Sequence, residues 1–238
     1  DVYKRQVVNI DLTDSGGAGL PSQQYLALGS GFVVKYSVGV GTAGGGTVDG
    51  YSDLKARVIV KRGSTVISEF QDAEFVGVTA GQSYTFDASP YLKDATAYTV
   101  QVEAQATYQG GMLMKTATAK VTMVAMTLET TYSVGNGLAD GGYRNDVNIP
   151  FTAKGTSGEK NIYYRVNGGQ AFTLGLSAGS GVQQKNVTIP LTQMQEGTNV
   201  VEAYAQHENS GVVSRVHYIT LLKEGGGVTA YAGMMFSH

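Results

Sequence analysis

The stretch from Tyr98 to Val121 most constrains the fold of this chain, because its apolar and polar side chains alternate. One face of the first run is apolar, with Tyr98, Val100, Val102, Ala104 and Ala106, and the other carries Thr99, Gln101, Glu103, Gln105 and Thr107. A period of two is typical of a half-buried strand. Gln109-Gly110-Gly111 then interrupts the run, and an apolar face resumes at Ala117, Ala119, Val121 and Met123. We therefore predict a long antiparallel hairpin with one solvent-facing side.

The same pattern returns about a hundred residues later, as a repeated structural unit would. Asn199, Val201, Ala203 and Ala205 alternate with Val200, Glu202, Tyr204 and Gln206, and Asn209-Ser210-Gly211 leads into a further run from Val212 to Lys223. Two copies of one closing hairpin predict two similar domains. We place the first at residues 7–125 and the second at residues 126–223, with the boundary near Met126.

The composition favours an all-β fold. The sequence contains 33 glycines but only 4 prolines, and the glycines cluster between runs rich in valine, threonine and tyrosine. We find no window with a sustained helical period, so we expect strands joined by turns. Short strands with long closing hairpins fit two tandem β-sandwich domains better than one barrel. One expected detail is that Pro150 confines the strand from Val147 to Ala153 to a sheet edge or a bulge.

Charge and cysteine content exclude some functions. The net charge is −2 and 15% of the residues are charged, so we expect no nucleic-acid partner, because no basic face could neutralise a phosphate backbone. Cysteine is absent, which excludes disulfides and thiolate metal sites. No apolar run is long enough for a helix that spans a membrane. We expect no cofactor.

The two ends of the sequence look unlike the rest. Residues 1–6 (Asp-Val-Tyr-Lys-Arg-Gln) resemble the translation of a transposase adapter used in shotgun sequencing, which would make the chain a metagenomic fragment with a non-native start. Residues 224–238 begin with a glycine-rich stretch and read as a hinge followed by the start of a truncated module.

The second half resembles a known class of repeats. Its pattern is Ile162 to Gly169, then Asn186 to Leu191, then Glu196 to Ala203. It is similar to the bacterial and phage immunoglobulin-like repeats that occur in tandem in tail, fibre and baseplate-type virion proteins. The chain contains no cysteine and no tryptophan, so the paired cysteines and core tryptophan of antibody domains are missing and the likeness concerns architecture. It implies a structural or adhesive role in a larger homo-oligomeric assembly.

Motifs that could carry chemistry lack the context that each one needs. Gly39 to Gly44 matches a dinucleotide fingerprint, but the glycines that follow cannot begin the helix that would meet a pyrophosphate. Gly175 to Gly179 matches a nucleophile elbow around Ser177, again without a following helix. The three histidines, His207, His217 and His238, show no metal-ligand spacing. We therefore expect no enzyme activity.

One surface constellation suggests binding. If Ile162 points inward, Tyr163 and Arg165 point outward, and the same parity puts Glu202 and Tyr204 outward on a strand that neighbours theirs in the immunoglobulin topology. Tyrosines with an arginine and a glutamate could form a contact surface for a glycan or a protein. The alternative is ordinary cross-strand pairing, with each pair contributing about 0.2 to 1 kcal/mol to the sheet.

Taken together, these features predict a non-enzymatic structural or adhesive segment of a phage virion protein, tail or fibre-like, from a gut metagenome. Its partners would be other virion or cell-surface proteins, or host glycans. Two alternatives stay open. One is a bacterial surface protein, or a secreted one, that binds glycans or mediates adhesion. The other is a set of accessory domains of a secreted glycoside hydrolase.

Overall fold

The computed structural model describes residues 5–132, 145–158, 160–176 and 181–224. The chain divides into two compact units, Asp1–Val124 and Ala125–His238. Most of residues 1–6 and 224–238, the expected non-native start and truncated module, lie outside the described residues. Among the described residues, no helix is long and apolar enough to cross a membrane.

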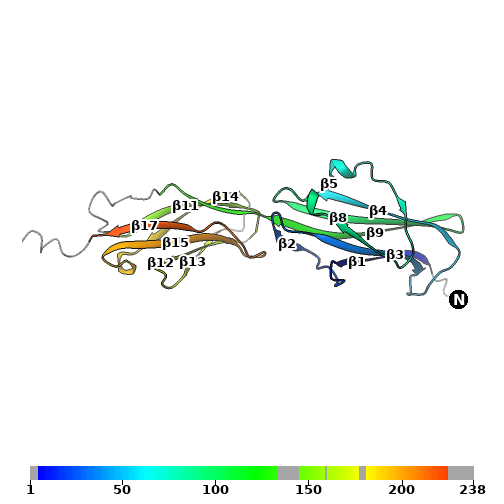
Figure 1. Cartoon of the computed structure of the whole chain (residues 1–238), viewed down its shortest axis with the longest axis horizontal. Coiled ribbons are helices and arrows are strands. Elements are labelled where there is room, and N and C mark those ends of the chain that lie inside the picture. Colours follow the sequence, from blue (N-terminus) through cyan, green and yellow to red (C-terminus); the bar gives the residue numbers. More distant parts are fainter. Residues whose placement is uncertain (1–4, 133–144, 159, 177–180, 225–238) are drawn as a thin grey trace, which may run out of the picture. The chain divides into compact units, whose positions relative to one another are not determined.

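The first unit consists of two sheets and two short 3-10 helices (Figure 1). Its strands are β1 (Gln6–Asp14), β2 (Gln24–Ala27), β3 (Val33–Thr42), β4 (Tyr51–Arg62), β5 (Thr65–Val66), β6 (Val76–Gly77), β7 (Ser83–Asp87), β8 (Ala97–Tyr108) and β9 (Gly111–Val124), and its 3-10 helices are η1 (Ser68–Phe70) and η2 (Ser89–Tyr91). One sheet has the order β1-β3-β7, and the other has the order β2-β9-β8-β4-β5, with β6 also paired to β4.

The predicted closing hairpin is the centre of the larger sheet. Strands β8 and β9 pair from Ala97↔Thr122 to Tyr108↔Gly111. The turn between them is made by Gln109 and Gly110, both at positive φ (49° and 80°), as two-residue hairpin turns of the primed types require. The apolar face predicted for β8 is buried along its whole length. This part of the sequence prediction is confirmed.

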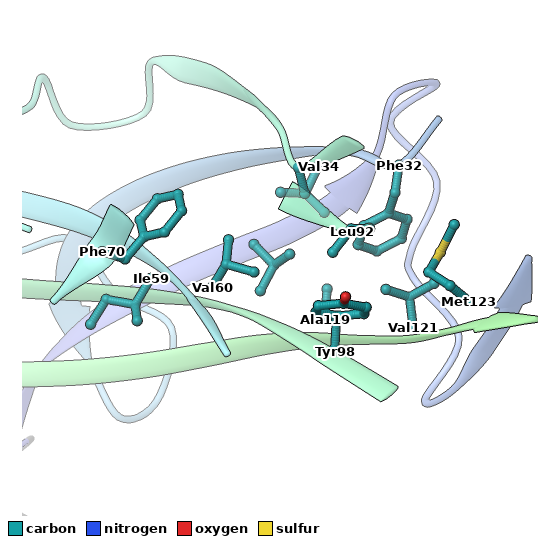
Figure 2. Packing of buried hydrophobic residues seen from close by; sticks show 12 residues of the cluster. Phe32, Val34, Ile59, Val60, Phe70, Leu92, Tyr98, Ala119, Val121 and Met123 are labelled. Atoms are coloured by element: carbon teal, nitrogen blue, oxygen red, sulfur yellow. The ribbon is translucent and has the colours of Figure 1, made fainter. Parts of the chain in front are cut away.

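The inner faces of the two sheets form the core of the first unit. Figure 2 shows Phe32 and Val34 on one side of this core and Tyr98 and Val121 on the other. All four side chains are buried. Side chains that alternate inward from two facing sheets are the basis of a β-sandwich.

The second unit repeats this arrangement. Its strands are β10 (Met126–Thr130), β11 (Val147–Gly155), β12 (Lys160–Val166), β13 (Phe172–Leu176), β14 (Gly181–Ile189), β15 (Gly197–His207), β16 (Val212–Val213) and β17 (His217–Lys223), with the 3-10 helix η3 (Leu191–Gln193). One sheet has the order β10-β11-β14, and the other has the order β13-β12-β15-β16, with β17 also paired to β15.

The strand order identifies the fold of both units. In the first unit, β1 pairs with β3 and β3 with β7, while β4 pairs with β8 and β8 with β9. In the second unit, β10 pairs with β11 and β11 with β14, while β12 pairs with β15 and β15 with β17. This is the pairing of an immunoglobulin-like sandwich, in which the two sheets exchange strands by Greek-key connections. In the first unit, β2 also pairs in parallel with β9. The chain therefore contains two tandem immunoglobulin-like β-sandwiches, as the sequence predicted.

We had expected Pro150 to confine its strand to a sheet edge or a bulge. That expectation is wrong for the strand as a whole, because β11 is the central strand of its sheet. The carbonyl of Pro150 points toward β10, where it accepts a hydrogen bond from Thr130 Oγ1 at 2.7 Å. The last pair of the β10 ladder is Thr130↔Phe151, so this ladder ends just before Pro150. The missing N–H of Pro150 therefore faces the side on which the β10 ladder has already ended, so no ladder hydrogen bond is lost. Pro150 occupies a local edge within a central strand.

We had predicted one continuous run from Val212 to Lys223, but the structure has two separate strands there. The run breaks after Val213 and resumes at His217. The hydroxyl of buried Ser214 accepts a hydrogen bond from the backbone N–H of Ala205 at 2.9 Å, so a side chain replaces a ladder bond there. The pairing register shifts by one residue across the break, from His207↔Val212 to Ala203↔His217. Such a slip exchanges which side chains face the core.

Candidate functional site

The four residues predicted to form a surface patch come together on the outer face of the larger sheet of the second unit. Strands β12 and β15 are antiparallel neighbours, with Tyr163 opposite Tyr204 and Arg165 opposite Glu202. Ile162, the residue immediately before Tyr163, is fully buried. Strand alternation thus turns all four predicted side chains away from the core.

The two tyrosines form one aromatic platform. Their ring centroids are 5.3 Å apart and their planes differ by 15°, which is a stacked arrangement. The Tyr163 hydroxyl donates a hydrogen bond to Glu208 Oε1 at 3.1 Å. Partial burial, and after it the hydrogen bond to Glu208, raises the pKa of the Tyr163 phenol above its ordinary value of 10.0. The platform is therefore neutral and is anchored at one end.

An ion pair lies beside the tyrosines. Arg165 Nε donates to Glu202 Oε2 at 2.5 Å, and the hydrogen bond and the charge of Glu202 raise the pKa of the guanidinium. The two side chains are 48% and 23% exposed, so solvent screens the pair and it contributes little to stability. Since the two charges offset each other, this ion pair adds no net charge to the site.

The sequence analysis missed Tyr218, which adds a third tyrosine to this face. Tyr218 lies opposite Glu202 on β17 and is 64% exposed. If the register of Val212 had continued without a break, His217 would have taken that position. The one-residue shift after Val213 turns Tyr218 outward instead, and no period-two argument from the sequence could locate that shift.

These side chains surround a pocket with a volume of about 310 Å³. Its lining comprises Tyr163, Tyr164, Arg165, Ala171, Glu202, Tyr204, Val216 and Tyr218. Ligand sites are mostly aromatic and apolar, with a few placed polar groups, and they begin at roughly 300 Å³. The pocket has this character at the lower end of that size range, so it suits one ring or one side chain.

The raised pKa of Tyr163 leads to a prediction. Glu208→Gln should lower the pKa of the Tyr163 phenol, though not fully to 10.0, because the contribution of burial remains. ¹³C NMR titration of the tyrosine rings would measure this, with Tyr163→Phe to assign the signal. As folding raises the pKa, the contribution of Tyr163 to stability is complete below pH 10.0 and is lost as the pH rises through the folded-state pKa. An unchanged pKa in Glu208→Gln would contradict the role of that hydrogen bond.

The other sequence motifs lie elsewhere. Gly39 belongs to β3, and the chain after Gly44 reaches β4 without a helix. Ser177 lies outside the described residues. His207 is buried, with Nδ1 2.9 Å from Ser210 Oγ and Nε2 3.0 Å from the carbonyl of Ser157. No group of three or more His, Cys, Asp or Glu side chains in the described part of the chain could hold a metal ion.

Comparison with known proteins gives only distant structural likenesses. No protein-family model and no curated protein matches the chain. A tetra-tandem repeat in the extending region of a large adhesion protein is similar at a TM-score of 0.42 and 13% identity, covering 92% of this chain and 50% of that one. Three N-terminal domains of the bacteriophage RB49 outer capsid protein Hoc have the same TM-score and identity, covering 92% and 71%. A two-domain fibronectin type III segment of chicken tenascin has a TM-score of 0.33 and 11% identity, covering 90% and 98%.

The chain thus spans half the length of the adhesion-protein structure that it resembles. At these scores and identities the likenesses support no transfer of function. The fold class rests on the strand order of the two units themselves.

Proposed function

We propose that this chain is a non-enzymatic structural or adhesive segment of a phage virion protein, in which the sandwiches act as spacers and the tyrosine face of the second unit makes the contact. The observation that carries this proposal is the pocket lined by Tyr163, Tyr204 and Tyr218 on an outer sheet face. Exposed aromatic side chains are enriched where proteins bind partners, because they bury a large area at low cost in side-chain entropy. The sequence pattern of the second half supports the virion assignment.

Contact by this face can be tested with the purified chain. We expect it to bind either intact particles or cells from its source sample, and Tyr163→Ala combined with Tyr204→Ala should reduce binding by about tenfold or more. Lys55 and Gln105 occupy a comparable cross-strand pair on the first unit, so Lys55→Ala with Gln105→Ala is the matched control and should bind normally. Equal binding by the tyrosine variant and the control would contradict the proposed contact face.

The virion assignment needs a separate measurement. Antibodies raised against the chain should label virus-sized particles from the source sample, and the uninterrupted reading frame should lie beside capsid, portal or tail genes. Labelling of cell envelopes, with transporter or lipoprotein genes alongside, would favour the alternative of a bacterial surface protein.

A further inference from the structure

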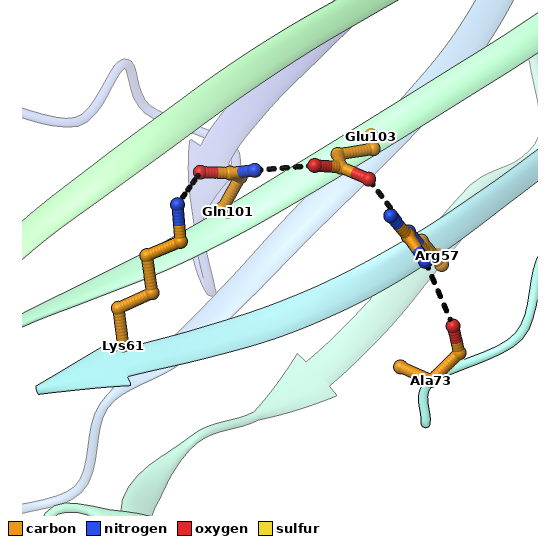
Figure 3. A network of polar contacts seen from close by, with 5 residues as sticks. All are labelled: Arg57, Lys61, Ala73, Gln101 and Glu103. Atoms are coloured by element: carbon orange, nitrogen blue, oxygen red, sulfur yellow. Dashed lines mark hydrogen bonds and ion pairs between the residues drawn. The ribbon is translucent and has the colours of Figure 1, made fainter. Parts of the chain in front are cut away.

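The ion pair of the candidate site has a counterpart in the first unit. Arg57 Nε donates to Glu103 Oε2 at 2.6 Å (Figure 3). Arg165 Nε donates to Glu202 Oε2 in the same way in the second unit. In the first unit, Arg57 on β4 lies directly opposite Glu103 on β8, and in the second unit Arg165 on β12 lies directly opposite Glu202 on β15. The two sites can therefore be compared position by position.

In the first unit, another segment of the chain covers the guanidinium. Arg57 donates a second hydrogen bond to the carbonyl of Ala73 at 3.0 Å, on the side away from Glu103 (Figure 3). The ring of Phe75 also lies against Arg57, with the guanidinium carbon 4.5 Å from the ring centroid. The Arg57 guanidinium thus makes a cation–π contact with Phe75 and a hydrogen bond to the carbonyl of Ala73, two residues before Phe75 in the chain. The Arg57 side chain is 31% exposed, whereas Arg165 is 48% exposed.

The register shows what differs in the second unit. Strand β6 pairs with β4 at Lys55↔Gly77 and Ala56↔Val76, so the next position opposite Arg57 belongs to Phe75. Strand β13 pairs with β12 at Tyr163↔Thr173 and Tyr164↔Phe172, so the next position opposite Arg165 belongs to Ala171. A methyl group thus stands where the first unit has a phenyl ring, and Ala171 lines the pocket.

We propose that the pocket binds an aromatic side chain presented by a segment of another protein, in the way that the first unit holds Phe75. The ring would stack on the Arg165 guanidinium between Tyr204 and Tyr218, and a backbone carbonyl two residues before it would accept a hydrogen bond from Arg165 Nη. Among the described residues, Arg165 makes its hydrogen bond through Nε only. This inference rests on the proposed contact function and names the class of partner.

The segment that covers Arg57 supplies the probe. A blocked peptide with the sequence of residues 71–77 (Gln-Asp-Ala-Glu-Phe-Val-Gly) should bind the full chain with a dissociation constant on the order of 1 mM, since a short flexible peptide loses much entropy on binding. Saturable NMR shifts should appear at the Ala171 methyl and the rings of Tyr204 and Tyr218. The same peptide with Phe75→Ala should bind about tenfold more weakly or not at all.

Two chain variants complete the test. Ala171→Phe should abolish peptide binding, because its own ring would occupy the pocket, while unchanged methyl signals of buried Ile162 and Val201 would show that the fold persists. Arg165→Lys should weaken binding, since an ammonium group cannot stack as a planar guanidinium does.

Three outcomes would overturn the inference. They are the absence of saturable shifts, peptide binding that survives Ala171→Phe, and equal binding of the peptide that lacks phenylalanine. If neutral oligosaccharides shift the same signals where the peptide does not, the partner is a glycan and the proposed contact function stands. If the tyrosine variants also keep full binding to particles and cells, the proposed contact function fails as well.

Discussion

Replacing Asn199 by alanine is expected to destabilise the second unit by about 3 to 5 kcal/mol, because it removes a fully used buried amide. The Asn199 side chain is 0% exposed. Its Nδ2 donates to the carbonyls of Gln195 and Gly197 at 2.8 and 2.9 Å, and its Oδ1 accepts from Asn167 Nδ2 and the Gln195 N–H at 2.7 and 2.9 Å. Each partner left unsatisfied costs about 1 to 3 kcal/mol if it stays buried.

The melting temperature of the second unit should fall by roughly 15 °C or more, measured by differential scanning calorimetry. Asn148→Ala is the matched control. Asn148 is exposed and accepts one hydrogen bond from Thr188 Oγ1, so we expect its loss to change stability by no more than about 0.5 kcal/mol. Asn199→Asp should also destabilise, because a carboxylate cannot donate to the two carbonyls. A cost below about 1 kcal/mol for Asn199→Ala would show that water replaces the amide easily.

Phe151→Ala should destabilise the second unit by about 3 to 5 kcal/mol and leave the first unit unchanged. Phe151 is the largest fully buried side chain in the described part of the chain, on the inward face of β11. Its removal takes away buried apolar area and leaves a cavity that the neighbouring strands can fill only in part. The buried core clusters around Phe32 and around Val8 consist of first-unit residues only, so that unit keeps its own source of stability.

Denaturant unfolding followed by methionine methyl NMR would separate the two units, because Met123 is buried in the first and Met194 in the second. Only the Met194 transition should move to lower denaturant. Phe172→Ala provides the control, since Phe172 is half-buried and stacked on Tyr164 with centroids 5.3 Å apart, so its loss should cost only about 1 kcal/mol. A joint shift of both methionine signals would mean that the units unfold as one cooperative body.

Much of the candidate site was predictable because it depends on strand parity. The outward positions of Tyr163, Arg165, Glu202 and Tyr204 follow from alternation on two strands that the immunoglobulin topology makes neighbours. Their binding role stays a proposal. The equivalence of Ala171 and Phe75 could not have been predicted from the sequence. It depends on the register in which the short strands β13 and β6 pair with the strands that carry Arg165 and Arg57.

The amino-acid sequence determined the strands, their buried faces and the positive-φ turn at Gln109 and Gly110, since these depend on a period of two and on local backbone preference. Only the tertiary structure decided the register. It shows the break at Ser214 that turns Tyr218 outward, and it shows why the polar side chain of Asn199 belongs on an inward face. The break depends on the hydrogen bond between Ser214 and Ala205 of the paired strand β15, and Asn199 depends on bonds to Asn167 and to the nearby backbone of Gln195 and Gly197. Neither set of hydrogen bonds leaves a period in the sequence.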